Sequence, residues 1–235
     1  MARSIRGVLF DKDGTLLDFE RTWAPVSRRC AERVAQRPEQ IDRLLERVGH
    51  DPSTDRFVPG SAIVAGTAQD VALGFAEVLG DGRSVEALTQ LIDATFLAEA
   101  GRCAVAIPGL TDLVARLRAR ALVLGVATSD NTASAEAALG VLELREHFAF
   151  VCGYDAGHGE KPGPGMVLGF CAQTGLKPSE IAVVGDSTHD LEMARAAGAG
   201  LCVGVLTGPA RHDDLAPLAD VVLGSAVELV AYLER

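Results

Sequence analysis

The sequence lacks the features of a membrane or secreted protein. The apolar run before Asp11 is too short for a signal peptide or a membrane span. The five cysteines are widely spaced and include no C-x-x-C pair, which favours neither a disulfide framework nor a zinc site. We therefore expect a cytoplasmic protein with no membrane partner, and we expect Cys152 and Cys202 to be core residues of predicted strands.

Positive charge is also in short supply. The chain has 22 Lys and Arg against 32 Asp and Glu, a formal net charge of −10. This balance disfavours nonspecific binding to nucleic acid or to an anionic membrane surface, so we expect no nucleic-acid partner. A small anionic substrate would need positive charge supplied locally, by a lysine, a helix N-terminus or a metal ion.

Apolar β-rich runs recur along the 235 residues, with helical patterns between most of them. One such pattern places Leu110, Leu113, Val114 and Leu117 on a single helix face. The alternation is typical of an α/β fold with a doubly wound, mostly parallel sheet that has helices on both faces. The predicted strands are residues 5–10, 122–127, 148–152, 181–185, 201–205 and 220–223.

Between residues 18 and 102 the alternation is interrupted, because one helical pattern follows another. We predict an inserted all-helical domain of residues 18–102 and a core domain of residues 1–17 and 103–235. Gly and Pro break the helical pattern over residues 51–66, where no clear periodicity remains, and we expect a loop there.

The first predicted strand runs directly into two carboxylates. Residues 8–10 are apolar and are followed by Asp11, Lys12, Asp13 and Gly14. Taking a carboxylate out of water costs several kcal/mol unless it is paired or bound to a metal, so packing alone does not explain this pair. The glycine allows a sharp turn at this point.

Other polar side chains follow three further predicted strands, and the C-terminal ends of the strands are where ligands bind in such a sheet. The four carboxylates of the two acidic pairs, Asp11 with Asp13 and Asp186 with Asp190, would repel each other by about 4 kcal/mol per pair at 4 Å and an effective dielectric of 20. A cation is therefore required, and oxygen ligands beside a phosphate favour Mg²⁺. The residues concerned are Asp11 and Asp13, then Thr128, Ser129 and Asp130, then Lys161, and finally Asp186, Ser187 and Asp190.

In order and spacing these residues resemble the four motifs of the haloacid dehalogenase superfamily of phosphohydrolases. The resemblance covers nearly the whole predicted core, and the insertion lies where this superfamily has its helical C1-type cap, as in the phosphoglycolate phosphatase-like branch. It implies a Rossmann-like core, Mg²⁺ as cofactor, and a small phosphorylated metabolite as substrate of a monomer or homodimer. The motifs are Asp11 to Thr15, Thr128, Lys161, and Gly185-Asp186 with Asp190.

The resemblance also implies a role for each residue. Asp11 is the nucleophile that forms an aspartyl-phosphate, and Asp13 is the general acid and then the general base. Thr128, Ser129 and Lys161 bind the phosphoryl group. The implied metal ligands are Asp11, Asp13 through its main-chain carbonyl, Asp186, and Asp190 in a supporting position.

Three alternatives remain open. A phosphomutase of the same fold would use the same residues. A 2-haloacid dehalogenase is disfavoured because it needs neither a metal nor an acid at the position of Asp13. A phospho-acceptor module of the receiver type also uses Asp, Mg²⁺, Thr and Lys, but such modules are about half this length.

Four side chains near the motifs call for a structural interpretation as well. We expect Lys12 to be solvated and His158 to face solvent, and we expect neither His158 nor His189 to bind a metal. For Trp23, on the first predicted helix of the insertion, packing within the cap and a wall of the substrate site are equally supported.

Overall fold

The computed structural model describes residues 5–234 of the chain. The predicted core ranges 1–17 and 103–235 therefore include five residues, 1–4 and 235, that lie outside the described part. No helix in the described part is both long enough and apolar enough to cross a bilayer.

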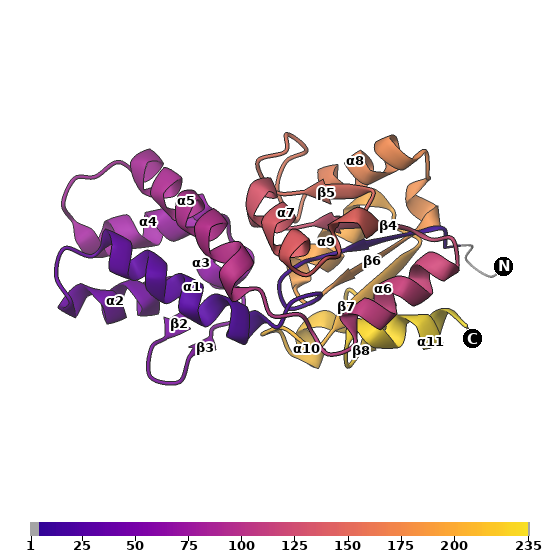
Figure 1. Cartoon of the computed structure of the whole chain (residues 1–235), viewed down its shortest axis with the longest axis horizontal. Helices are drawn as coiled ribbons and strands as arrows, with labels where there is room; N and C mark the ends of the chain where they lie inside the picture. The colour runs from indigo at the N-terminus through magenta and orange to yellow at the C-terminus, as the bar shows by residue number, and fades with distance from the viewer. Residues whose placement is uncertain (1–4, 235) are drawn as a thin grey trace.

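Six parallel strands form the main sheet, in the order β5-β4-β1-β6-β7-β8, so the first strand of the chain lies near the centre (Figure 1). The predicted α/β fold with a parallel sheet is thus confirmed, and two of the predicted strands have the predicted bounds. The strands are β1 (Gly7–Phe10), β4 (Val123–Ala127), β5 (Phe150–Cys152), β6 (Ile181–Gly185), β7 (Leu201–Val205) and β8 (Val221–Leu223).

Alternating side chains of β1 divide the interior into two apolar cores, one on each face of the sheet. Val8 and Phe10 pack in the core that contains the apolar faces of α6, α7 and α11. Leu9 packs in the other core, with α8, α9 and α10. The helices are α6 (Leu110–Ala119), α7 (Thr132–Val141), α8 (Gly165–Thr174), α9 (Thr188–Ala197), α10 (His212–Leu215) and α11 (Leu229–Leu233), with short 3-10 turns at Arg145–His147, Pro178–Glu180 and Ala226–Glu228.

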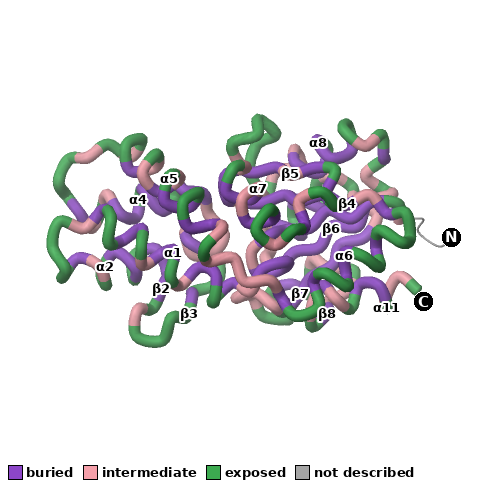
Figure 2. Tube along the Cα trace, viewed as in Figure 1, coloured by how far each residue is buried: buried purple, intermediate pink, exposed green. Residues whose placement is uncertain are grey.

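The helical cap lies at one end of the sheet and has an apolar core of its own (Figures 1 and 2). Its helices pack through faces that contain Val34, Leu44, Leu45, Phe75 and Ile92, all almost fully buried. The cap helices are α1 (Phe19–Val34), α2 (Glu39–Val48), α3 (Ala62–Ala65), α4 (Ala68–Leu79) and α5 (Val85–Cys103).

The prediction of a loop over residues 51–66 was wrong in part. The segment takes part in a small antiparallel pair, β2 (His50–Asp51) with β3 (Arg56–Phe57), and contains the one-turn helix α3. The carboxylate of Asp51 accepts hydrogen bonds from the amide of Ser53 and the hydroxyl of Thr54, which closes the turn between the two strands. Strands of two residues and a helix of one turn are too short to show a periodicity in the sequence.

Candidate active site

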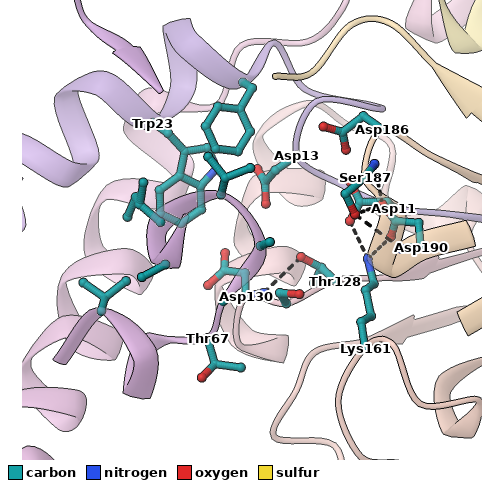
Figure 3. A pocket seen from close by; sticks show the side chains of 18 of the residues that line it. Asp11, Asp13, Trp23, Thr67, Thr128, Asp130, Lys161, Asp186, Ser187 and Asp190 are labelled. Atoms are coloured by element: carbon teal, nitrogen blue, oxygen red, sulfur yellow. Dashed lines mark hydrogen bonds and ion pairs between the residues drawn. The ribbon is translucent and has the colours of Figure 1, made fainter. Parts of the chain in front are cut away.

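The register of the sheet brings the predicted strand-end residues together. Phe10 of β1 is level with Val126 of β4 and with Val184 of β6. The residues that follow these three positions therefore emerge side by side at the carboxyl edge, next to the cap. All nine of the predicted strand-end residues line one cavity there: Asp11, Asp13, Thr128, Ser129, Asp130, Lys161, Asp186, Ser187 and Asp190 (Figure 3).

The turn after β1 depends on Gly14. Its φ of +84° lies in the left-handed region, and a Cβ at this position would lie 2.5 Å from Oδ2 of Asp186. The hydroxyl of Thr207 donates a hydrogen bond to the carbonyl oxygen of Gly14, at 2.5 Å. The absence of a side chain at residue 14 thus allows the first motif and Asp186 to approach closely.

Lys161 joins two of the carboxylates. Its Nζ lies 2.6 Å from Oδ1 of Asp11 and 2.6 Å from Oδ1 of Asp190, and all three side chains are buried. The other oxygen of Asp190 accepts hydrogen bonds from the hydroxyl of Ser187, at 2.7 Å, and from its amide. Asp190 is therefore held through both of its oxygens, whereas Asp11 is held through Oδ1 by Lys161.

Three carboxylates form a cluster that suits a divalent cation. Asp11, Asp186 and Asp190 each offer an oxygen, and these three oxygens lie within 4.8 Å of one another. Burial raises the pKa of Asp11 to about 7 and outweighs the charge of Lys161, which lowers it; the charges of Asp190 and Asp13 raise it further by smaller amounts. Burial, and then the charges of Asp11 and Asp190, raise the pKa of Asp186. Since buried carboxylates are unfavourable without a cation, this donor set fits a hard ion such as Mg²⁺.

Asp13 presents one oxygen to the cavity and the other to a lysine. Its Oδ2 lies 2.7 Å from Nζ of Lys12, whereas its Oδ1 is buried and has no hydrogen-bond partner among the described residues. A carboxyl group with one oxygen held by a lysine and the other without a partner can exchange a proton with a molecule bound beside it.

The prediction that Lys12 is solvated was wrong. The residue is 2% exposed, and its ammonium group also lies 3.1 Å from Oδ2 of Asp130 and 5.5 Å from the ring centre of Trp23. Burial lowers the pKa of Lys12, but the charges of Asp13 and Asp130 outweigh this effect and the net shift is upward. The two carboxylates stabilise a buried ammonium that the polarity of lysine alone would place in water.

The second strand end is organised around Asp130. Its Oδ2 accepts a hydrogen bond from the hydroxyl of Ser134, and its amide donates one to Oγ1 of Thr128. From the sequence we expect Asp130 at a strand end, but the sequence indicates no partner for its carboxylate. Its partner Lys12 lies more than a hundred positions earlier in the chain, and no local spacing indicates a contact of that kind.

The two histidines near the motifs lie outside the cluster of Asp11, Asp186 and Asp190. His158 is exposed, and its ring lies 5.8 Å from that of Phe150. Nδ1 of His189 lies 3.3 Å from the carbonyl oxygen of Ala65, so this histidine connects the core to the cap.

The cap closes the cavity with a mostly apolar wall. Trp23 of α1 is one of its members, and the space between cap and core has a volume of about 30 Å³. This part of the site has no motif in the sequence. The wall residues are Phe19, Trp23, Ile63, Val71 and Phe96, together with the loop of residues 62–67.

Comparison with known proteins gives a consistent result. A family model described as "haloacid dehalogenase-like hydrolase" matches residues 5–198. A phosphoglycolate phosphatase from Chromobacterium violaceum is 27% identical over 227 residues, which cover 97% of this chain and 96% of that protein. A phosphoglycolate phosphatase from Escherichia coli is 28% identical over 199 residues, 83% of this chain and 79% of that protein.

Solved structures share the fold. The crystal structure of a predicted phosphoglycolate phosphatase from Haemophilus somnus superposes with a TM-score of 0.74 at 18% identity and covers 97% of this chain and 98% of that chain. CbbY from Rhodobacter sphaeroides, solved in complex with phosphate, has a TM-score of 0.71 at 22% identity and covers 98% of this chain and 100% of that chain.

Proposed function

The chain belongs to the haloacid dehalogenase-like hydrolases, and on this basis we propose that it is a Mg²⁺-dependent phosphomonoesterase that forms an aspartyl-phosphate on Asp11. The observation that carries the proposal is the joint geometry of two carboxylates. Asp11 is held by Lys161 within an acidic cluster, and Asp13 has an oxygen without a partner that lines the same cavity.

Asp11 is the proposed nucleophile. Lys161 binds its Oδ1, which leaves Oδ2 to attack the phosphorus atom and displace the alkoxide of the substrate. The covalent step divides a difficult transfer into two easier ones, phosphorylation of Asp11 and hydrolysis of the aspartyl-phosphate.

Asp13 is the proposed general acid and base. Its Oδ1 gives a proton to the leaving alkoxide in the first step and takes a proton from the attacking water in the second. Lys12 holds Oδ2 and so keeps the carboxyl group directed toward the cavity.

Three side chains are the proposed phosphoryl-binding groups. Thr128 and Ser129 follow the end of β4, Lys161 lies in the loop after β5, and all three line the cavity; Figure 3 shows Thr128 and Lys161. Together they would donate hydrogen bonds to phosphoryl oxygens and neutralise part of the charge.

A divalent ion fits the acidic cluster, and we assign its ligands to Asp11, Asp186, Asp190 and the main-chain carbonyl of Asp13. When bound, Mg²⁺ supplies positive charge that offsets the charge of the phosphoryl group and of the carboxylates. The residues of this chain supply the nucleophile, the acid and the hydrogen bonds.

The proposal also assigns a role to each of the two domains. We assign residues 1–17 and 103–235 to the catalytic core and residues 18–102 to a cap that excludes water from the cavity. The enzyme would act in the cytoplasm as a monomer or homodimer.

The lining of the cavity favours a small phosphorylated metabolite, of the phosphoglycolate-like class, over a hexose phosphate. The wall that the cap provides has few polar groups for sugar hydroxyls. Hydrolysis is therefore favoured over phosphomutase activity, although both would use the same catalytic residues.

A phosphatase assay tests the proposal. Phosphate release is measured from a panel of small phosphomonoesters, with Mg²⁺ and with EDTA, for the wild type and for Asp11→Asn. We expect release that requires Mg²⁺ and is lost in the variant. Failure to release phosphate from every ester, or release unchanged by EDTA, contradicts the proposal. Transfer within a hexose 1-phosphate, followed by NMR, would instead indicate a phosphomutase.

A further inference from the structure

The wall that faces the catalytic carboxylates is built from aromatic and aliphatic side chains of the cap. The rings of Trp23 and Phe96 meet edge to face at 4.8 Å, and the rings of Phe19 and Trp23 are 6.3 Å apart. Ile63 and Val71 complete the apolar surface. We call these five residues the aromatic wall. Each is at most 6% exposed, so the wall is a packed surface with a fixed shape.

Positive charge is scarce around this cavity. Among the described residues that line it, Lys161 alone carries a positive charge. Its ammonium group already lies 2.6 Å from both Asp11 and Asp190, at the phosphoryl end of the site. The ammonium of Lys12 lies 5.5 Å from the ring centre of Trp23, but Lys12 does not line the cavity and is already paired with Asp13 and Asp130. A second anionic group on the substrate would therefore find no unpaired cation on the side of the aromatic wall among the described residues. Burying an unpaired carboxylate is strongly unfavourable.

The cap loop beside the wall offers no substitute for a cation. The four amide groups of residues 64–67 all donate hydrogen bonds within the loop, to acceptors on Ser61, Ala62 and Asp70. The hydroxyl of Thr67 also donates, to Oδ2 of Asp70 at 2.9 Å. Backbone N–H groups that could form an anion-binding nest are thus already used.

One donor in the wall remains. Trp23 is 6% exposed. Its Nε1 is buried and has no hydrogen-bond partner among the described residues. The ammonium of Lys12 lies 5.5 Å from the centre of the ring, and a cation at a ring uses its π-electrons, whereas the N–H bond lies in the ring plane. A buried N–H without a partner is rare and unfavourable in a folded protein, so a bound molecule that accepts this hydrogen bond would relieve it.

We infer that the aromatic wall and Nε1 of Trp23 form the subsite for the leaving group, and that they select phosphomonoesters whose leaving group is small, uncharged and carries a hydrogen-bond acceptor oxygen. The inference rests on the proposed phosphatase function. It excludes phosphomonoesters with a carboxylate on the leaving group, phosphoglycolate among them, as the preferred class. A carbonyl, ester or ether oxygen next to a short apolar chain meets the requirements of the subsite.

Three matched substrates separate charge from hydrogen bonding. Phosphoglycolate carries a carboxylate, its methyl ester keeps the carbonyl oxygen without the charge, and ethyl phosphate has neither group. We expect kcat/KM for the methyl ester to exceed that for phosphoglycolate by at least about tenfold, because only the ester avoids a buried unpaired charge.

Two variants test the assignment of the donor. Trp23→Phe removes the N–H group and keeps an aromatic ring, so the ratio of kcat/KM for the methyl ester to that for ethyl phosphate is expected to fall by about tenfold. Ala62→Arg places a cation beside the wall and is expected to raise the ratio for phosphoglycolate over its methyl ester. Tyr232→Phe, on α11 in the core domain, is the control and is expected to leave both ratios unchanged.

The outcomes distinguish the inference from the function on which it rests. Phosphate release with a preference for phosphoglycolate over its methyl ester overturns the inference and leaves the phosphatase function intact. An equal loss of activity in Trp23→Phe toward the methyl ester and ethyl phosphate also overturns it. No Mg²⁺-dependent release from any ester of a wider panel, with folded protein, overturns both.

Discussion

The ammonium group of Lys12 lies 2.7 Å from Oδ2 of Asp13 and leaves Oδ1 of the same carboxylate directed at the cavity without a partner. The proposed acid and base of the reaction is therefore anchored by its own neighbour in the sequence. Asp130, 3.1 Å from the same ammonium, completes a buried arrangement of one cation between two anions.

The first prediction concerns this arrangement. Lys12→Met leaves the carboxylates of Asp13 and Asp130 buried without their cation, and we expect the free energy of unfolding to fall by about 3–5 kcal/mol. Urea denaturation measures the change. Arg6→Met, which removes an ion pair that is largely exposed to solvent, is the matched control and should have a much smaller effect. Equal, small effects of the two substitutions would contradict the buried role of Lys12.

A second prediction separates activity from stability at Asp11. Asp11→Asn should lower phosphatase activity by at least about 10³-fold, because the amide is not a nucleophile. Burial raises the pKa of Asp11 to about 7, so the ionised carboxylate is unfavourable in the folded protein. At a pH above 7 and in EDTA, the neutral asparagine should therefore not lower the melting temperature. Thermal unfolding at such a pH tests this, with the exposed Asp42→Asn as control. Strong destabilisation by Asp11→Asn would contradict the account.

A third prediction concerns pH and Mg²⁺. In the folded protein without metal, the pKa of Asp11 is about 7, above its ordinary value of 3.8. Between these two pH values the folded state therefore binds more protons than the unfolded state. The contribution of Asp11 to the free energy of unfolding falls as the pH rises through this window. Because Mg²⁺ binds the ionised carboxylates, its stabilising effect should grow from about pH 5 to about pH 8. Melting temperatures with Mg²⁺ and with EDTA at each pH provide the measurement, and a stabilisation by Mg²⁺ that does not change with pH would be inconsistent with this site.

A fourth prediction concerns the contact between cap and core. The hydroxyl of Tyr154, which follows β5, donates a hydrogen bond of 2.6 Å to Oδ2 of Asp93 on α5, and Asn131 donates to the other oxygen. Tyr154→Phe removes one of these bonds and should weaken the closed position of the cap, raising KM by about three- to tenfold with a smaller change in kcat. Steady-state kinetics measure this effect, with Tyr232→Phe as control. An unchanged KM would show that the contact does not hold the cap.

Much of the fold could be predicted from the sequence because the strands of a parallel sheet are apolar on both faces. Residues 181–185 and 201–205 have the predicted bounds for this reason. The first strand is shorter than predicted: it begins at Gly7, after Ile5 and Arg6. In the segment 51–66 the elements are too short for any periodicity, and their hydrogen bonds come from Asp51 and from contacts with the rest of the cap.

The candidate site was predictable where it depends on topology, and less so where it depends on contacts between distant parts of the chain. Asp11, Thr128 and Asp186 meet because parallel strands end at one edge. The burial of Lys12 depends on Asp130, and the position of Trp23 depends on how the cap packs over the core. Neither contact leaves a local pattern in the sequence.

The most direct test of the central claim is to trap the phosphoryl group on the protein. The Asp13→Asn variant, which should hydrolyse the aspartyl-phosphate slowly, is mixed with a phosphorus-labelled substrate and Mg²⁺, quenched in acid and digested with pepsin, which is active at the acidic pH that preserves acyl phosphates. The peptide that contains Asp11 is then identified by mass spectrometry. We predict label on this peptide that requires Mg²⁺ and is absent when Asp11 is also replaced by Asn; label on another peptide, or phosphate release with no labelled protein at any time, would contradict the proposed role of Asp11.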